Sequence, residues 1–359
     1  MARTPSRSRG RPRVEIRVKS ATIAWTSCLV LAGLVFLERS FARRAASDGV
    51  ERLVPAARME GRTLAGFTLE SAGQDLTYLR SRGLWRCREA FGAVCETEAV
   101  AAFLSAVTGA RGSLVCAGDE CVERAGVRAP DGLRLALHGP KFLTDPARDT
   151  YFELALGPAR TPEQGGAPFA EVAGTGRVLE IDRDPRVFLD ATGRPAPLVD
   201  TRVLAGCFAP GFAGFERMFV DRGDGSAEIT SETPADPNAE RRWFLVEGES
   251  RREALLWRVG GYVSLWVRMR WEGIDDPRQV IALGLDPPLA TITLAPNVGE
   301  TVQIRVSAPD AANRVHLWNR ATNVVAWVRA EWLPEIVPAA EDFTRVEGGN
   351  PWERWLVPR

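Results

Sequence analysis

Two stretches near residue 70 alternate apolar and polar side chains, which is the pattern of half-buried β-strands. The apolar positions in this alternation are Phe67, Leu69, Leu76 and Tyr78. Gly73 lies between the two runs, and the second run leads towards Trp85. The pattern therefore predicts a hairpin.

An amphipathic helix is predicted after this hairpin, within residues 96–110. Acidic residues lie at its start and Gly109 lies near its end, as expected for helix termini. The apolar residues at helical spacing are Val100, Phe103, Leu104 and Val107. Residues 124–140 then read as a turn followed by an alternating strand.

The same order of elements recurs later in the chain. Strand-like runs at 227–232 and 241–248 precede a longer apolar helix, predicted from about Glu253 to Trp271. A Gly-Leu-Asp-Pro-Pro turn and an alternating strand follow this helix.

A shared offset relates the two stretches. Gly284 follows Gly126 by 158 positions, and Trp243 follows Trp85 by the same 158. The offset indicates a duplicated domain. A smaller offset near the end of each copy predicts extra loops in the first copy, at residues 141–150 and 157–176.

Antiparallel strands with one main helix in each copy predict the α+β class. We expect two tandem α+β modules of this kind after one N-terminal transmembrane helix. The predicted segments are a basic cytoplasmic leader at 1–20, a transmembrane anchor at 21–37, a linker at 38–60, a first α+β repeat at 61–206, a second α+β repeat at 207–346 and a tryptophan-containing C-terminal tail at 347–359.

Residues 21–37 form an uncharged stretch that is long enough to cross the lipid bilayer as a helix. The basic leader before it favours a cytoplasmic N-terminus and a periplasmic or otherwise extracytoplasmic body. The expected location is therefore the bacterial inner membrane, crossed once. A cleaved signal peptide is the alternative, because it also combines a basic start with a short apolar core.

Charge and histidine content exclude several classes of function. The chain has no net charge, so the part after the basic leader is acidic, which argues against binding to nucleic acid. The only histidines, His138 and His316, lie in predicted strands and lack the partners of a catalytic triad. No dinucleotide-binding or Walker sequence is present. We expect no enzymatic activity and no cofactor.

Two acidic pairs, Asp182 with Asp184 and Asp275 with Asp276, are the remaining candidates for a metal site or for acid and base catalysis. Each pair lies beside Pro and Arg in a turn sequence, where aspartate commonly bonds its own backbone. We interpret both pairs as turns and expect no metal.

Four cysteines, Cys87, Cys95, Cys116 and Cys121, fall in the first copy. Their spacing matches zinc ribbons poorly and no histidine lies nearby, so disulfides are the preferred interpretation. Four cysteines permit three connectivities. Local pairing of Cys87 with Cys95 and of Cys116 with Cys121 is our working hypothesis.

Eleven tryptophans are many for this length, and several lie where a partner could bind. The candidate partner-binding residues are Trp257, Trp266, Trp271, Trp352, Trp355 and Leu356. The first three lie on the long predicted helix, which is apolar on more than one face, and the others lie at helical spacing in the tail. The alternatives are that these side chains fill the second core and that the tail docks on its own domain.

The sequence resembles a family of bacterial tandem-repeat domains of unknown function. The resemblance rests on the strand pair ending near Trp85, the "LSAV" helix, the turn and strand "GLDPPLATITL" and the final "VVAWVRAEWL", and it covers most of residues 60–345. Members are typically encoded beside gliding-motility-type ABC transporter genes. The first copy departs from the pattern, because it reads "GVRAPDGLRLAL" at the turn and adds cysteines.

The expected function follows from this resemblance and from the lack of catalytic motifs. We expect a non-enzymatic, membrane-anchored accessory or scaffold subunit of an envelope assembly. The resemblance implies an ABC-type transporter of the gliding-associated class as that assembly, with its permease and auxiliary subunit as partners and with residues 21–37 in the bilayer. The alternative is an extracytoplasmic module that binds polysaccharide or peptide for a transporter.

Overall fold

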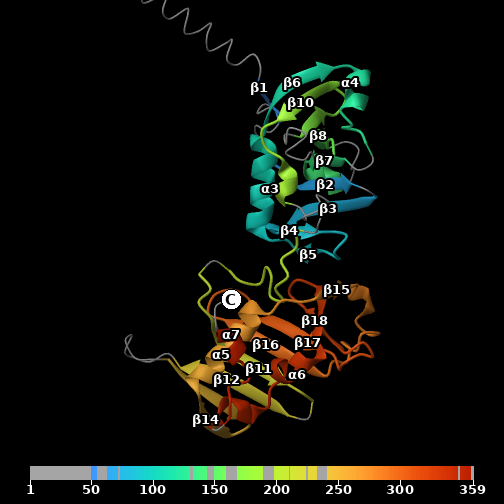
Figure 1. Ribbon diagram of the computed structural model, residues 1–359. Helices are drawn as coiled ribbons and strands as arrows, with labels where there is room; N and C mark the ends of the chain where they lie inside the picture. The colour runs from blue at the N-terminus through green and yellow to red at the C-terminus, as the bar shows by residue number, and fades with distance from the viewer. Residues whose placement is uncertain are drawn as a thin grey trace, which may run out of the picture.

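The computed structural model describes residues 50–54, 63–71, 73–129, 132–143, 149–158, 168–188, 198–209, 211–223, 225–232, 241–346 and 348–356. These residues form two domains that follow one another along the chain and are joined by a narrow connection (Figure 1). Each domain is built on one large antiparallel sheet.

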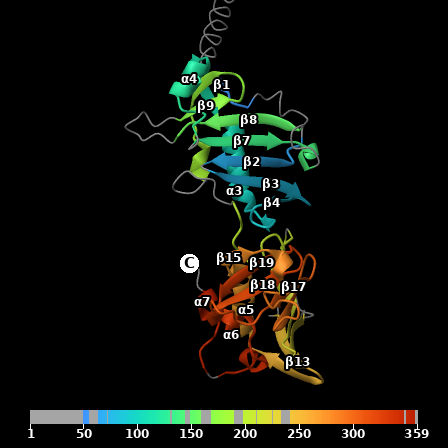
Figure 2. The same ribbon diagram turned by 90° about the vertical axis from the view of Figure 1, so that its right-hand side faces the viewer.

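The first sheet has ten strands in the order β1-β6-β10-β9-β8-β7-β2-β3-β4-β5. Figure 2 shows β8, β7, β2 and β3 side by side in this order. The strands are β1 (Val50–Arg52), β2 (Gly66–Ser71), β3 (Gln74–Ser81), β4 (Leu84–Cys87), β5 (Ala93–Val94), β6 (Arg111–Ala117), β7 (Leu133–His138), β8 (Thr150–Leu156), β9 (Phe169–Val172) and β10 (Arg177–Ile181).

The second sheet has nine strands in the order β14-β13-β12-β11-β16-β17-β18-β19-β15. Its strands are β11 (Phe215–Asp221), β12 (Ser226–Glu232), β13 (Arg242–Glu247), β14 (Ser250–Ala254), β15 (Gly273–Asp275), β16 (Ala290–Pro296), β17 (Val302–Val306), β18 (Arg314–Asn319) and β19 (Val324–Arg329).

The two sheets share one topology once β1 is set aside. Strands β2 to β5 correspond to β11 to β14, β6 corresponds to β15, and β7 to β10 correspond to β16 to β19, with the same neighbours throughout. Trp85 lies opposite Arg80 in the first sheet, and Trp243 lies opposite Ser231 at the equivalent register position of the second. The 158-residue offset thus links equivalent positions in the fold.

Each sheet buries its inner face against a helix of equivalent position in the chain, α3 (Thr97–Gly109) or α5 (Leu256–Arg268). Phe103 of α3 packs with Phe67 in the first core, and Trp266 of α5 packs in the second core with Val220 and Ile292. Alternation along the strands explains this arrangement, because every second residue points to the same face.

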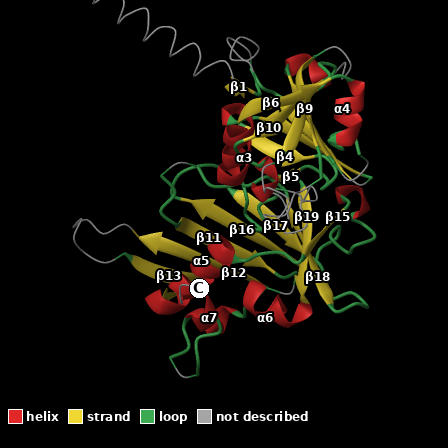
Figure 3. Cartoon of the chain, turned by 45° about the horizontal axis from the view of Figure 1, so that its top comes forward, coloured by secondary structure: helices red, strands yellow, loops and turns green. Residues whose placement is uncertain are grey.

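The remaining helices are short. They are α4 (Asp119–Arg124), η1 (Pro140–Leu143), η4 (Pro185–Phe188), η5 (Pro277–Gln279), η6 (Ala330–Trp332), α6 (Leu333–Ile336), η7 (Ala340–Phe343) and α7 (Glu353–Leu356). Figure 3 shows α5, α6 and α7 gathered on one side of the second sheet. Helix α4 covers the opposite face of the first sheet from α3, since its Val122 packs on Val178 in a separate apolar cluster.

The predicted α+β class is wrong: the described chain is mostly β, with two large antiparallel sheets. The predicted loop at 141–150 includes the first residue of β8, and the predicted loop at 157–176 contains the whole of β9. The long second helix begins at Leu256 and not near Glu253, because Ser250–Ala254 pairs with β13 as strand β14. Leu53 and Val54, in the predicted linker, are buried in the first core.

The predicted anchor at 21–37 and the leader at 1–20 lie outside the described residues. Within the described part of the chain, no helix is both long enough and apolar enough to cross a membrane.

A short segment, residues 198–203, pairs with both domains in succession. In the first domain the Glu96 amide donates to the Leu198 carbonyl at 3.0 Å, and in the second the Val203 amide donates to the Met269 carbonyl at 3.0 Å. Leu198 is buried in the first core, whereas Val203 is buried in the second. The connection between the domains is therefore part of both.

Candidate functional site

His316 on β18 is buried at the centre of a polar cluster in the second domain. Its Nδ1 lies 2.9 Å from the Asp275 carboxylate, and its Nε2 lies 3.2 Å from the Asp310 carboxylate. The backbone N–H of Arg314, helped by the Arg314 and His316 side chains, holds the pKa of Asp310 well below its usual range. Both ring nitrogens are occupied, so the cluster fastens β15 and the turn before β18 onto the sheet.

His138 on β7 is enclosed in the first domain. Its Nε2 lies 3.1 Å from the Thr68 hydroxyl and its Nδ1 lies 3.2 Å from the Thr150 hydroxyl, while Phe142 stacks on the ring at 3.7 Å. Burial lowers the pKa of His138 to about 4. This imidazole, held between two hydroxyl groups, joins three neighbouring elements of the first domain.

In each acidic pair interpreted as a turn, one aspartate bonds a neighbouring backbone amide and the other bonds a residue far away in the chain. Asp184 accepts from the Arg186 amide at 2.9 Å, and Asp276 accepts from the Arg278 amide at 2.9 Å at the start of η5. Asp182 accepts from the Arg111 amide at 2.8 Å. Among the described residues, no group of three His, Cys, Asp or Glu could hold a metal ion.

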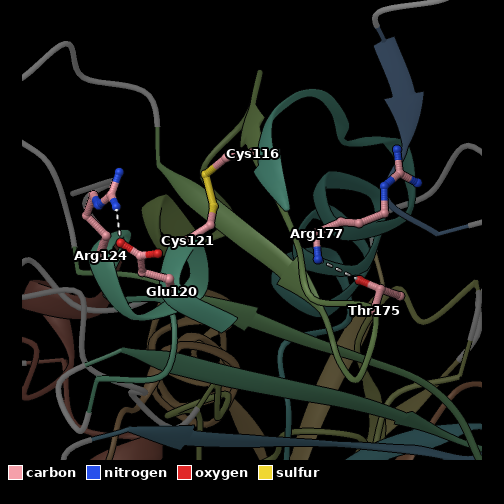
Figure 4. The surroundings of a disulfide bond; sticks show 6 residues. All are labelled: Cys116, Glu120, Cys121, Arg124, Thr175 and Arg177. Atoms are coloured by element: carbon pink, nitrogen blue, oxygen red, sulfur yellow. Dashed lines mark hydrogen bonds and ion pairs between the residues drawn. A yellow bond between two sulfur atoms is a disulfide. The ribbon is translucent and has the colours of Figure 1, made fainter. Parts of the chain in front are cut away.

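One of the two hypothesised disulfides is present. Cys116, in β6, is bonded to Cys121, in α4, and Figure 4 shows this bond tying the helix to the strand before it. Cys87 and Cys95 are buried free thiols, so their pairing was wrong. The register explains this result: Cys87 lies opposite Ala93, and the Cys95 amide bonds the Trp85 carbonyl, so the two cysteines are displaced along the strands.

The tail after Gly348 docks on its own domain. The Trp352 indole packs on Tyr262 and Phe343 at ring distances of 5.3 and 5.2 Å, and its N–H donates to the Glu335 carbonyl at 3.0 Å. Trp355 donates to the Glu335 carboxylate at 2.8 Å. The tail completes the second core.

The six candidate partner-binding residues differ in how deeply they are buried. Trp266 and Trp352 are fully buried, so they cannot contact a partner. Trp271 and Trp355 are half-buried against the second core, and only Trp257 is substantially exposed, at 43%. Leu356 ends α7, and its side chain lies outside the described part of the structure.

A groove that the sequence did not predict runs across the outer face of the first sheet. Its volume is about 330 Å³, and small side chains from neighbouring strands line it: Thr68 of β2, Ala136 of β7 and Ala155 of β8. Thr68 lies opposite Ala136, and Ala155 lies opposite the buried Glu171 of β9. In the sequence, the only sign of this groove is the small outward-facing residue Ala136 in "LRLALH", where every second residue faces away from the core.

Charged side chains surround this groove. Arg128 makes two hydrogen bonds to Glu171, at 2.8 and 2.9 Å, and the Gly176 amide donates to the same carboxylate at 3.1 Å. Glu70, Glu153 and Arg134 also line the groove. The Arg128–Glu171 pair closes one side, and the other charges face solvent.

No protein-family model matches the chain, and no curated protein matches it either. The histidine clusters fasten segments of the fold, the tail completes a core, and the groove in the first sheet is lined by charged side chains.

Proposed function

We propose that the protein is a non-catalytic scaffold or accessory subunit of an envelope assembly, which holds two sheet surfaces at a fixed spacing. The junction between the domains supports this proposal most strongly. Residues 198–203 extend the hydrogen bonding of both domains, and Ile274 and Val324 of the second domain pack against the first core. A junction built into both cores suits a spacer between partners.

The disulfide supports a position outside the cytoplasm, since such bonds persist mainly in oxidising compartments. The resemblance to repeat domains encoded beside transporter genes supports an ABC-type transporter of the gliding-associated class as the assembly. Its permease and auxiliary subunit are then the proposed contacts.

The test is to purify the tagged, full-length protein from its own host in mild detergent and to quantify co-purifying proteins by mass spectrometry. A Gly206→Val variant is the matched perturbation, because a Cβ at Gly206 would lie 3.0 Å from Leu84 and 3.1 Å from Val94 across the junction. Gly211→Val is the control, since Gly211 also has a positive φ but has no atom within 4 Å of that Cβ.

We expect transporter subunits at stoichiometric levels with the unaltered protein and with Gly211→Val, and a marked loss with Gly206→Val while circular dichroism shows both sheets intact. Recovery of the unaltered protein without any stoichiometric partner would overturn the proposal. So would undiminished recovery of the partners with Gly206→Val when its junction is shown to be open by limited proteolysis.

A further inference from the structure

The two sheets share one topology, but the second sheet carries different side chains at the strand positions that form the groove on the outer face of the first sheet. The buried pair Leu69 and Leu135 of the first sheet corresponds to the buried pair Val220 and Ile292 of the second. With these pairs superposed, each outward-facing position of the first sheet can be matched to one of the second. The equivalent groove positions carry larger side chains in the second sheet: Phe219 for Thr68, Thr293 for Ala136 and Arg305 for Ala155.

The second domain therefore shows that the fold does not require a groove here. Arg305 crosses the equivalent space to bond Asp286 at 2.8 Å and lies over the Trp318 ring at 5.4 Å. In the first domain Ala155 leaves that space open. The groove therefore depends on the small side chains of the first domain and not on the strand topology that the two domains share.

The charge of the groove is negative. Glu70, Glu153 and Glu171 line it together with Arg128 and Arg134, and Asp119 lies 3.8 Å from Arg128 at the rim. Neither Glu70 nor Glu153 forms an ion pair with another residue in the described ranges, whereas Glu171 is satisfied by Arg128. The carboxylates of Glu70 and Glu153 outnumber the one remaining guanidinium of the lining, that of Arg134, so the groove favours a cation as the bound group.

We propose that this groove binds a lysine or arginine side chain presented by a peptide segment of a partner protein. The lining residues include no aromatic ring, which disfavours sugars because they usually stack on aromatic faces. A volume of about 330 Å³ lies at the lower end of small-ligand pockets, which suits one long side chain. The assignment goes beyond the scaffold role and does not depend on it.

The test measures fluorescence anisotropy of a labelled nonapeptide of alternating lysine and alanine, added to the purified full-length protein. Peptides of alternating glutamate and alanine, and of alternating glutamine and alanine, serve as charge controls. Ala136→Leu fills the groove without changing its charge, and Glu153→Gln removes one carboxylate. Glu98→Gln is the matched control, because Glu98 is exposed on α3 at the other face of the sheet.

We expect saturable binding of the lysine peptide alone, weakened about tenfold by Ala136→Leu and by Glu153→Gln and unchanged by Glu98→Gln. If Ala136→Leu lowers the melting temperature, Ala173→Gln at the exposed wall replaces it. Equal binding of the lysine and glutamate peptides, or unaltered binding in both groove variants, would overturn the proposal. Tighter binding of a chitosan oligosaccharide would also overturn it in favour of an aminated sugar. None of these results affects the co-purification test of the scaffold role.

Discussion

The Arg86 guanidinium, in the first domain, donates a hydrogen bond of 3.1 Å to the backbone carbonyl of Thr322, in the second. The same nitrogen donates to the Gly92 carbonyl at 2.8 Å, so one side chain ties a turn of its own domain to a turn of the other. Asn319 adds a bond of 3.0 Å to the Val203 carbonyl in the connecting segment. These polar contacts orient the domains while the apolar side chains around them exclude water.

Gly206→Val should destabilise the protein more than Gly211→Val. Both glycines have positive φ, at 72° and 88°, so both substitutions carry the same backbone penalty. Only the side chain at residue 206 meets Leu84 and Val94, which adds roughly 1–3 kcal/mol of overpacking. Urea unfolding of the two variants measures the difference, and equal midpoints would contradict this account of the junction.

Two neighbouring glycines of α5 should respond in opposite directions to alanine. Gly260→Ala should stabilise the protein by about 0.5–1 kcal/mol, because a Cβ there meets nothing within 4 Å and alanine favours a helix. Gly261→Ala should destabilise it, because its Cβ would lie 2.7 Å from the Trp352 Cβ and would push the tail away. Thermal unfolding of the matched pair gives the sign of each effect.

Trp352→Ala should lower the free energy of unfolding by roughly 3–5 kcal/mol, as expected for removal of a buried tryptophan. Trp257→Ala is the control, since this exposed side chain should contribute less than about 1 kcal/mol. Deleting residues 350–359 should therefore lower the melting temperature even when no partner is present. An unchanged melting temperature would show that the tail is dispensable for the core.

Stability should fall as the pH is lowered from about 6.5 towards 4, and His138 should account for part of the loss. The folded protein holds the pKa of His138 at about 4, whereas the unfolded chain takes up the proton near 6.5. The unfolded state thus binds more protons in this window, which weakens folding by at most about 3 kcal/mol. His138→Gln should flatten the pH dependence of urea midpoints between these values, and an unchanged slope would contradict the assignment.

Cys87 and Cys95 should resist alkylation in the native protein at pH 8 and should react after unfolding. Burial raises the pKa of both thiols, so little thiolate forms.

Peptide mapping without reductant should find Cys116 linked to Cys121. Replacing both cysteines by serine should lower the free energy of unfolding by about 2 kcal/mol, because the disulfide closes only a short loop. A bond between Cys87 and Cys95 in that map would contradict the structure.

The sequence predicted features that depend on local pattern. Alternation located β2 and β3, helical spacing located α3, and the repeated Gly126 and Gly284, with φ of 66° and 67°, marked equivalent turns. Segments whose state depends on pairing were missed. Ser250–Ala254 continues into an apolar helix in sequence, yet it forms a strand because β13 offers it a partner.

The groove was missed for a related reason. Thr68, Ala136 and Ala155 are far apart along the chain and are unremarkable as residue types, so only the register of three strands brings them to one face. The disulfide hypothesis failed for Cys87 and Cys95 because spacing along the chain says nothing about displacement between strands. The sequence alone could not show where the aromatic tail docks, because Glu335 and Tyr262, which Trp352 contacts, lie on other elements of the second domain.

The common strand order of the two domains creates a hazard during folding. Neighbouring domains of one topology can exchange strands while they form, and such misassembly is a known failure of tandem repeats. Here the interior positions have diverged in size, with Tyr78 where the second domain has Ile229 and Cys87 where it has Leu245. An exchanged strand would leave a void in one domain and a clash in the other, so this divergence in size disfavours the exchange.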